Sequence, residues 1–248
     1  MKSASFESAP HYHFASIDST NNYASKIAKL PETSNGTAIS ADFQSEGRGQ
    51  RGTSWESASQ QGYLVSFILY PNLQAPEVFY FSKFIAVCLQ HTLNQLGLEK
   101  VQIKWPNDIY LDSKKLAGIL IENTWSDQEF QFGIAGIGLN IQPPSNTGFH
   151  STGLAEHLSA LPTLNDYVLA FQRTLHEHWH WIEQKKFNEI DQQYHRHLFQ
   201  LHESKSFITA NGEHFLGKIQ RVESDGALII QDEKNTEQAF YLKEIKFA

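Results

Sequence analysis

The segment SEGRGQRGTSW, residues 45–55, restricts the fold of this chain more than any other stretch. Its glycines Gly47, Gly49 and Gly52 follow the spacing G-x-G-x-x-G. In a dinucleotide-binding fold this spacing joins a strand directly to a helix, and an acidic residue follows after about 20 positions. Here strand-forming segments lie on both sides, at 37–44 and 63–70, and no such acidic residue follows. The sequence therefore excludes a Rossmann fold and predicts a long functional loop between two strands.

The charges in this loop predict an anionic ligand. Arg48 and Arg51 alternate with glycines that let the backbone come close to a bound molecule, and a guanidinium suits phosphate or carboxylate. Trp55 offers a flat apolar surface for a ring. The net charge of −7 argues against a general nucleic-acid binder, because the positive charge is local. We expect the loop to close over a small anion.

The hydrophobic pattern predicts a mixed α/β fold. Helices are expected near 18–30 and 76–97 and twice within 165–200, and strands at 101–105, 108–111, 115–123 and 131–141. From Ser204 the pattern changes to short strands separated by turn pairs such as Asn211-Gly212. We therefore predict a main domain over 1–202 and a small β domain over 203–248.

Composition sets the compartment expected for the chain. The single cysteine, Cys88, lies in an apolar run and is expected to be a buried core residue. No segment has the length and apolarity of a membrane helix or the layout of a signal peptide, so we expect a cytoplasmic protein with no membrane partner.

Four motifs together make the chain recognisable. They are DSTNNYA (18–24), FQSEGRGQRGTSW (43–55), KWPNDIYLDSKKLAGILIE (104–122) and GIGLNI (136–141). In this order the sequence resembles biotin protein ligase over nearly its whole length. The resemblance implies a mixed-sheet catalytic domain of the biotin/lipoate ligase type, which is class II synthetase-like, followed by an SH3-like C-terminal domain.

The resemblance also implies a two-step reaction. Biotin would react with ATP, accompanied by Mg²⁺, to give biotinyl-5'-AMP, and the biotinyl group would then pass to one lysine of a carrier domain of a biotin-dependent carboxylase. Bringing a carboxylate against a triphosphate opposes like charges, and fixed cations lower that barrier. By the resemblance, Lys115 is the first choice for this catalytic role, supported by Arg48 and Arg51.

Further site residues are carried over by position. The residues expected to bind biotin are Ser19, Thr20, Asn21, Gln44, Arg48, Gly49, Gln50, Lys115 and Gly118. The residues expected to bind ATP or the adenylate are Gly47, Arg48, Gly49, Gln50, Arg51, Trp55, Lys104, Asn107, Asp108, Lys115 and Asn140. Small residues at Gly118, Gly136 and Gly138 would leave room for the biotin tail, and no protein ligand to a resident metal is expected.

Two departures from the family pattern carry expectations. Gln50 and Thr53 stand where well-known members have basic residues, so retention of the adenylate is in question. The first motif begins by residue 18, so we expect a ligase without a DNA-binding segment and without repressor function. The sequence leaves open whether the chain is a monomer or a homodimer.

Three other interpretations compete with this one. The segment HEHWH (176–180) satisfies the zinc-protease pattern H-E-x-x-H, but the stripe Val168, Phe171, Leu175, Trp179 and Ile182 leaves His176 and His180 on the helix flank. A lipoate-protein ligase would share the adenylation chemistry, and GRGQRG with KWPND favours biotin. A non-catalytic sensor is disfavoured because Arg48, Arg51 and Lys115 are all present.

Overall fold

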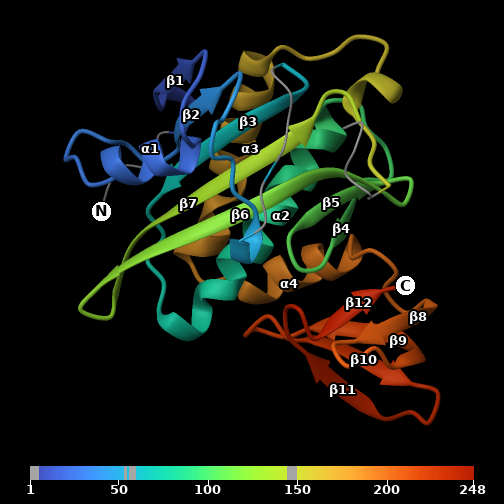
Figure 1. Cartoon of the computed structure of the whole chain (residues 1–248). Coiled ribbons are helices and arrows are strands. Elements are labelled where there is room, and N and C mark those ends of the chain that lie inside the picture. Colours follow the sequence, from blue (N-terminus) through green and yellow to red (C-terminus); the bar gives the residue numbers. More distant parts are fainter. Residues whose placement is uncertain (1–5, 53–54, 56–59, 144–149) are drawn as a thin grey trace.

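Two β-sheets of different size organise the chain (Figure 1). The structure is a computed structural model that describes residues 6–52, 55, 60–143 and 150–248, with the side chains of Glu7 and Arg51 outside the description. The larger sheet and its helices form the upper part of the molecule in Figure 1, and the smaller sheet lies below them. The predicted mixed α/β class is confirmed.

The larger sheet has seven strands in the order β1-β2-β3-β7-β6-β5-β4. All neighbours are antiparallel except β1 and β2, which are parallel. The strands are β1 (His11–Phe14), β2 (Thr37–Ala41), β3 (Gly62–Leu69), β4 (Gln102–Lys104), β5 (Asp108–Leu111), β6 (Lys114–Ser126) and β7 (Glu129–Asn140). The sequence predicted every strand of this sheet but β1.

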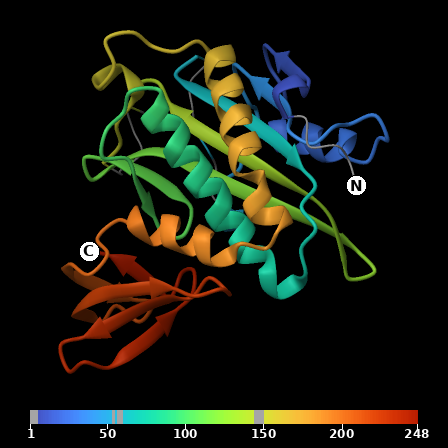
Figure 2. The ribbon, with the colours of Figure 1, turned by 180° about the vertical axis from the view of Figure 1, so that it is seen from behind.

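Helices cover both faces of this sheet, and they cover them differently. The helices are α1 (Thr20–Ile27), α2 (Val78–Gln95), α3 (Leu164–Glu183) and α4 (Phe187–Arg196), with short 3₁₀ turns at Phe6–Ser8, Gln50–Gly52, Ala75–Glu77 and Leu154–Glu156. Figure 2 shows α2 and α3 lying across the back of the sheet. The smaller α1 packs on the opposite face, where Ala24 contacts a cluster with Ile68 and Ile134. The rest of that face is left to the loops.

The sequence explains why α2 is the central helix. Its residues from Phe81 to Leu93 are almost all buried, because the helix lies between the sheet, α3 and α4. Gly97 follows its end with φ +98°, a conformation that glycine adopts without strain. Cys88 is fully buried in this helix, and burial raises the pKa of its thiol, so its predicted core role is confirmed.

The smaller sheet has five antiparallel strands in the order β11-β10-β9-β8-β12. They are β8 (Ser204–Thr209), β9 (His214–Val222), β10 (Leu228–Asp232), β11 (Glu237–Phe240) and β12 (Ile245–Phe247). The predicted change of pattern near Ser204 is the start of β8. The exact division into domains at 202 and 203 stays a prediction.

The two sheets are held together by buried contacts. Phe207, Ile219 and Val222 of the smaller sheet belong to the same apolar cluster as α2. The indole N–H of Trp105 donates to the carbonyl of Gly226 at 2.9 Å, and Lys83 Nζ donates to the carbonyl of Val222 at 2.7 Å. The C-terminal sheet is therefore fixed against the KWPND segment and against α2. Among the described residues, no helix is long and apolar enough to cross a membrane.

Candidate active site

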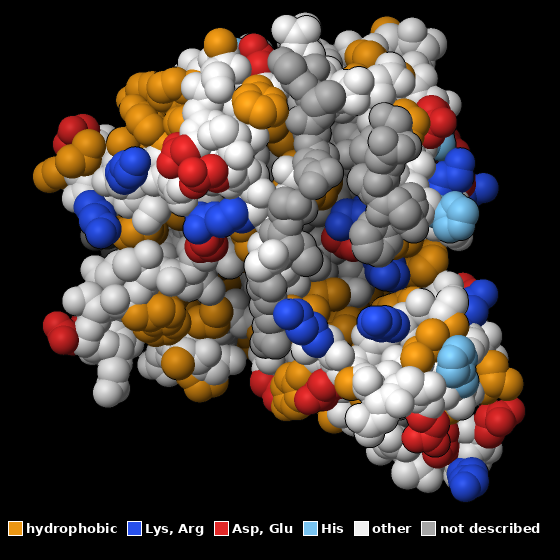
Figure 3. Space-filling view, viewed as in Figure 1, with side chains coloured by type: hydrophobic (Ala, Val, Ile, Leu, Met, Phe, Trp, Pro, Cys, Tyr) orange, Lys and Arg blue, Asp and Glu red, His pale blue; other side chains and the backbone are white. Residues whose placement is uncertain are grey.

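A row of residues across four strands forms the floor of the candidate site. Lys104 is paired with Asp108, Asp108 with Gly118, and Gly118 with Gly138. Because side chains alternate along a strand, Gly136, Gly138 and Asn140 lie on one face of β7. This face is opposite to the one covered by α2 and α3. Figure 3 shows several lysine and arginine side chains on this side of the molecule, above the smaller sheet.

The N-terminus of α1 supplies a buried polar corner. Ser19 caps the helix, and Gln44 Oε1 accepts from Thr20 N at 2.7 Å and from Thr20 Oγ1 at 2.9 Å. Ser66 Oγ lies 2.7 Å from Thr20 Oγ1 and 2.5 Å from Asn21 Oδ1. The hydroxyls of Thr20 and Ser66 hold two protons for three oxygen–oxygen contacts. One of these contacts therefore lacks a proton, so the corner can accept a hydrogen bond from an N–H group of a ligand.

Glu122 joins this corner to the glycine loop. Its Oε2 accepts from Asn21 Nδ2 at 2.7 Å and from Arg48 Nη2 at 2.9 Å. Both partners of the ion pair are partly exposed, so an anionic ligand can compete with Glu122 for the guanidinium. The sequence predictions named neither Glu122 nor Ser66. Their position follows from strand register, for which the sequence carries no local signal.

Trp55 lies over the glycine pair of the floor. A Cβ at Gly118 would come within 2.7 Å of its indole, and a Cβ at Gly138 would overlap the same ring. Trp55 N donates to the carbonyl of Gly47 at 3.0 Å, and a Cβ at Gly47 would come within 2.5 Å of the carbonyl of Trp55. Within the described residues the indole N–H is buried without a hydrogen-bond acceptor. The glycines predicted to make room for a ligand tail thus also make room for this ring.

Lys115 lies beside this ring and next to an acid. Its Nζ is 2.7 Å from Asp108 Oδ1 and 5.5 Å from the centre of the Trp55 ring. The backbone around it is fixed, because Lys115 N donates to the carbonyl of His150 and Asn140 Nδ2 donates to the carbonyls of Lys115 and Thr152. The structure therefore brings Lys115, Asp108 and Asn140 together.

Lys104 and Asn107 both contact other parts of the protein, in addition to the ligand role that the sequence predicts for them. Asn107 ties the turn between β4 and β5 to β6, since its Nδ2 donates to the carbonyl of Ile119 and its own carbonyl accepts from Ile119 N. The ammonium of Lys104 lies 5.0 Å from the ring centre of Tyr110 and 4.3 Å from that of Phe247. Burial lowers the pKa of Lys104, while Asp108 raises it and Lys115 lowers it further. The role of both residues at a nucleotide stays a prediction.

The glycine loop itself is described in part. It connects β2 with β3 as predicted and forms a 3₁₀ turn at Gln50–Gly52. Gly49 and Gln50 lie in it, half-buried. Thr53 and the side chain of Arg51 are outside the described residues, so their predicted roles stay predictions.

The zinc-protease pattern in α3 is a surface feature. Val168, Phe171, Leu175, Trp179 and Ile182 are buried as predicted, and His176 is exposed. The histidine between the two pattern residues, His178, has its Nε2 3.0 Å from His91 Nδ1. In the part of the chain that the structure describes, no group of three or more His, Cys, Asp or Glu side chains is arranged to hold a metal.

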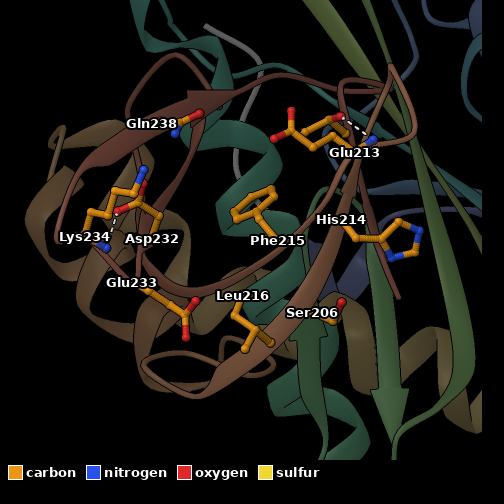
Figure 4. A pocket seen from close by; sticks show the side chains of 10 residues that line it. Ser206, Glu213, His214, Phe215, Leu216, Asp232, Glu233, Lys234 and Gln238 are labelled. Carbon is orange, nitrogen blue, oxygen red and sulfur yellow. Dashed lines mark hydrogen bonds between the residues drawn. The ribbon is translucent and has the colours of Figure 1, made fainter.

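A second hollow lies in the C-terminal sheet. It has a volume of about 570 Å³ and is lined from β8, β9 and the turn after β10, including Phe215, Glu213 and Lys234 (Figure 4). One of its acids, Asp232, serves a local turn, because it accepts from Lys234 N at 2.9 Å. None of the predicted site residues lines it, so we place the candidate site at the larger sheet.

Comparison with known proteins agrees with this geometry. The model of the Biotin/lipoate A/B protein ligase family matches residues 13–140. The bifunctional ligase/repressor BirA of Escherichia coli is 35% identical over 125 residues, which cover 50% of this chain and 38% of that protein. The biotin--[acetyl-CoA-carboxylase] ligase of Paracoccus denitrificans is 33% identical over 150 residues, covering 58% of this chain and 60% of that protein. Among solved structures, the biotin protein ligase of Aquifex aeolicus in complex with biotin and ATP has a TM-score of 0.74 at 22% identity, covering 96% of this chain and 99% of that one.

Proposed function

The chain belongs to the biotin/lipoate A/B protein ligase family, and we propose that it is a biotin protein ligase. It activates biotin with ATP as biotinyl-5'-AMP and transfers the biotinyl group to a lysine of a biotin carboxyl carrier domain. The similarity to the Paracoccus denitrificans enzyme and the fold shared with the Aquifex aeolicus ligase support this assignment.

The polar corner at α1, with one hydroxyl contact short of a proton, is the observation that carries the proposal. Biotin is a ureido ring with two N–H groups, fused to a sulfur ring and an apolar tail. The oxygens of Gln44, Asn21 and Ser66 suit the N–H groups, and the side-chain N–H of Asn21 or the hydroxyl of Thr20 suits the ureido carbonyl. The tail then extends from this corner toward Lys115, beside the Trp55 ring that covers Gly118 and Gly138.

Lys115 lies where it can offset the repulsion between the two negatively charged reactants of the first step. Its ammonium forms an ion pair with Asp108. A biotin carboxylate and an ATP α-phosphate that arrive together both carry negative charge, and Lys115 stabilises their approach. Arg48, released from Glu122, adds a second cation from the glycine loop.

The chemistry of Asp108 fits the magnesium ion that accompanies ATP. Mg²⁺ is commonly held by one or two carboxylates together with substrate phosphates, and Asp108 is the carboxylate beside the catalytic lysine. When bound, the ion would supply charge neutralisation on the phosphates. Asp108 would then divide its interactions between Lys115 and the ion.

Two alternatives lead to different expectations. A lipoate-protein ligase would have to accept a dithiolane ring that carries no N–H group, which would leave the acceptors of Thr20, Ser66 and Asn21 without their complement. A non-catalytic sensor would not need the partly buried pairing of Lys115 with Asp108. The site therefore supports a catalytic role with biotin as the substrate better than it supports either alternative.

The test is labelling of an apo carrier domain with radioactive biotin, ATP and Mg²⁺. We expect transfer by the wild-type chain, loss with Lys115→Ala, and normal transfer with Lys114→Ala, an exposed lysine next to it. We also expect Thr20→Val to raise the KM for biotin by about tenfold, the cost of an unmatched buried hydrogen bond. Labelling with lipoate instead of biotin would overturn the proposal.

Several finer points stay predictions from the sequence. They are the cytoplasmic location, the absence of a DNA partner, the identity of the carrier, and a monomeric or homodimeric state. The reduced retention of adenylate expected from Gln50 and Thr53 belongs with them.

A further inference from the structure

The ammonium of Lys104 lies between two aromatic rings, a clamp with one ring from each of the two β-sheets. It lies 5.0 Å from the ring centre of Tyr110, on β5, and 4.3 Å from that of Phe247, on β12. Both distances are within the range of a cation–π interaction, which grows stronger when water is excluded. Phe247 is in the last strand of the C-terminal sheet, so the two sheets meet at this ammonium.

The clamped lysine lies on the strand next to the one that carries Asp108. Lys104 and Asp108 are opposite each other on β4 and β5, and Asp108 binds Lys115 at 2.7 Å. The strand with Asp108, β5, lies between β4 and β6, which carry the two lysines. Burial lowers the pKa of Lys104, Asp108 raises it and Lys115 lowers it. Two lysines on either side of one carboxylate provide one positive charge more than that carboxylate neutralises.

Phe247 is itself held firmly. Its ring packs edge-on against Phe207, with centres 5.4 Å apart, and β12 pairs with β8. The next residue, Ala248, donates its N–H to the carbonyl of Ser206 at 3.1 Å. On the other side of the clamp, Trp105, the residue after Lys104, is hydrogen-bonded to Gly226 of the C-terminal sheet. The ring is therefore a fixed wall for Lys104.

We propose that Phe247 is a positioning residue for adenylation, through which the C-terminal sheet holds the Lys104 ammonium beside Asp108 and Lys115 for the phosphates of ATP. This inference rests on the proposed ligase function. Phe247 touches no substrate; its effect is to keep one cation of the site in place during the first step and to leave biotin recognition at α1 unchanged.

The test compares two phenylalanines of the C-terminal sheet. Phe247→Leu removes the ring from Lys104, whereas Phe215→Leu removes a partly buried ring that also packs on Phe207 but does not contact Lys104. We expect Phe247→Leu to lower the kcat of biotin-dependent pyrophosphate release by about two- to thirtyfold, the range of one cation–π contact. The KM for biotin should stay unchanged, and Phe215→Leu should behave as wild type.

Rescue and coupling separate positioning from a general loss of structure. Phe247→Tyr should keep kcat close to the wild-type value. In a Lys104→Met background, Phe247→Leu should lower kcat little further, since the ring then has no ammonium to hold. The proposal would be overturned if Phe247→Leu and Phe215→Leu lowered kcat equally. It would also be overturned if Phe247→Leu lowered kcat by the same factor in the wild-type and Lys104→Met backgrounds.

A spectroscopic readout keeps the clamp testable apart from activity. With lysine labelled with ¹³C at the ε position, the Lys104 signal, assigned through Lys104→Arg, should be shifted upfield by the ring of Phe247. The shift should vanish in Phe247→Leu and persist in Phe215→Leu. A wild-type chain that shows this shift but no biotin-dependent activity would refute the ligase function and leave the clamp standing; absence of the shift would refute the clamp.

Discussion

The ion pair between Lys83 and Asp191 joins α2 to α4, and the same ammonium binds the C-terminal sheet, so removal of this pair has a predictable cost. Lys83 is fully buried, and its Nζ is 2.6 Å from Asp191 Oδ1 and 2.7 Å from the carbonyl of Val222. The side chain of Asp191 is 30% exposed. The two halves of the pair therefore differ in how well water can replace a lost partner.

This difference fixes the order of two substitutions. Lys83→Met leaves a carboxylate that water can reach and one carbonyl without its donor, so we expect a loss of about 2–3 kcal/mol in the free energy of unfolding. Asp191→Asn leaves an ammonium that water cannot reach, and we expect about 3–5 kcal/mol. The double variant should cost about as much as Lys83→Met alone, because the buried charge is gone.

The pH dependence gives the same prediction a second test. Burial lowers the pKa of Lys83 and Asp191 opposes that shift, so the pKa falls further in Asp191→Asn. Between the folded and unfolded pKa values the unfolded chain binds more protons, and stability therefore rises with pH. Part of the loss in Asp191→Asn should return when the pH is raised from 7 toward 10, while Lys83→Met should show no such recovery relative to wild type.

Urea unfolding followed by tryptophan fluorescence measures all of these variants. The account predicts that Asp191→Asn is less stable than Lys83→Met at pH 7. If Lys83→Met were the more damaging change, or if Asp191→Asn were equally destabilised at pH 7 and pH 10, the reasoning from unequal exposure would be wrong.

Three further predictions concern the site and its surroundings. Gly138→Ala should displace the indole of Trp55, at a cost of about 1–3 kcal/mol in binding of an adenylate analogue by calorimetry, and should cost almost nothing more in a Trp55→Ala background; an unchanged cost there would place the clash elsewhere. Glu122→Gln should free Arg48 and tighten the same analogue by about 1.5- to fivefold, since a partly exposed ion pair is worth about 0.2–1 kcal/mol; weaker binding would contradict this. Burial lowers the pKa of His91 to about 4, so the folded state loses stability as the pH falls from about 6.5 toward 4, and His91→Gln should flatten that decline in urea midpoints.

Local pattern was sufficient to predict most elements of the fold. The buried stripe of α3 and the start of the C-terminal sheet at Ser204 follow from the spacing of residues that lie close together in the sequence. β1 was missed because it is four residues long, lies at the sheet edge and pairs in parallel with β2, so it shows no alternation of buried and exposed positions.

The sequence predicted the site only for residues that lie together in one motif. Lys115 and Asp108 come from a single segment, and the structure joins them in an ion pair. Ser66 and Glu122 reach the corner at α1 through the pairing of β3, β6 and β7, and Phe247 reaches Lys104 through the packing of two sheets. These contacts depend on register and tertiary packing, which no local stretch of sequence encodes.

The central claim is that this site activates the carboxylate of biotin with Lys115 as the decisive cation. Biotin-dependent exchange of pyrophosphate into ATP measures that step without a carrier. The account predicts exchange that requires biotin and falls by about 100-fold or more in Lys115→Ala, the cost of removing one preorganised charge from a transition state. Exchange that requires lipoate instead, or Lys115→Ala with wild-type exchange, would contradict it.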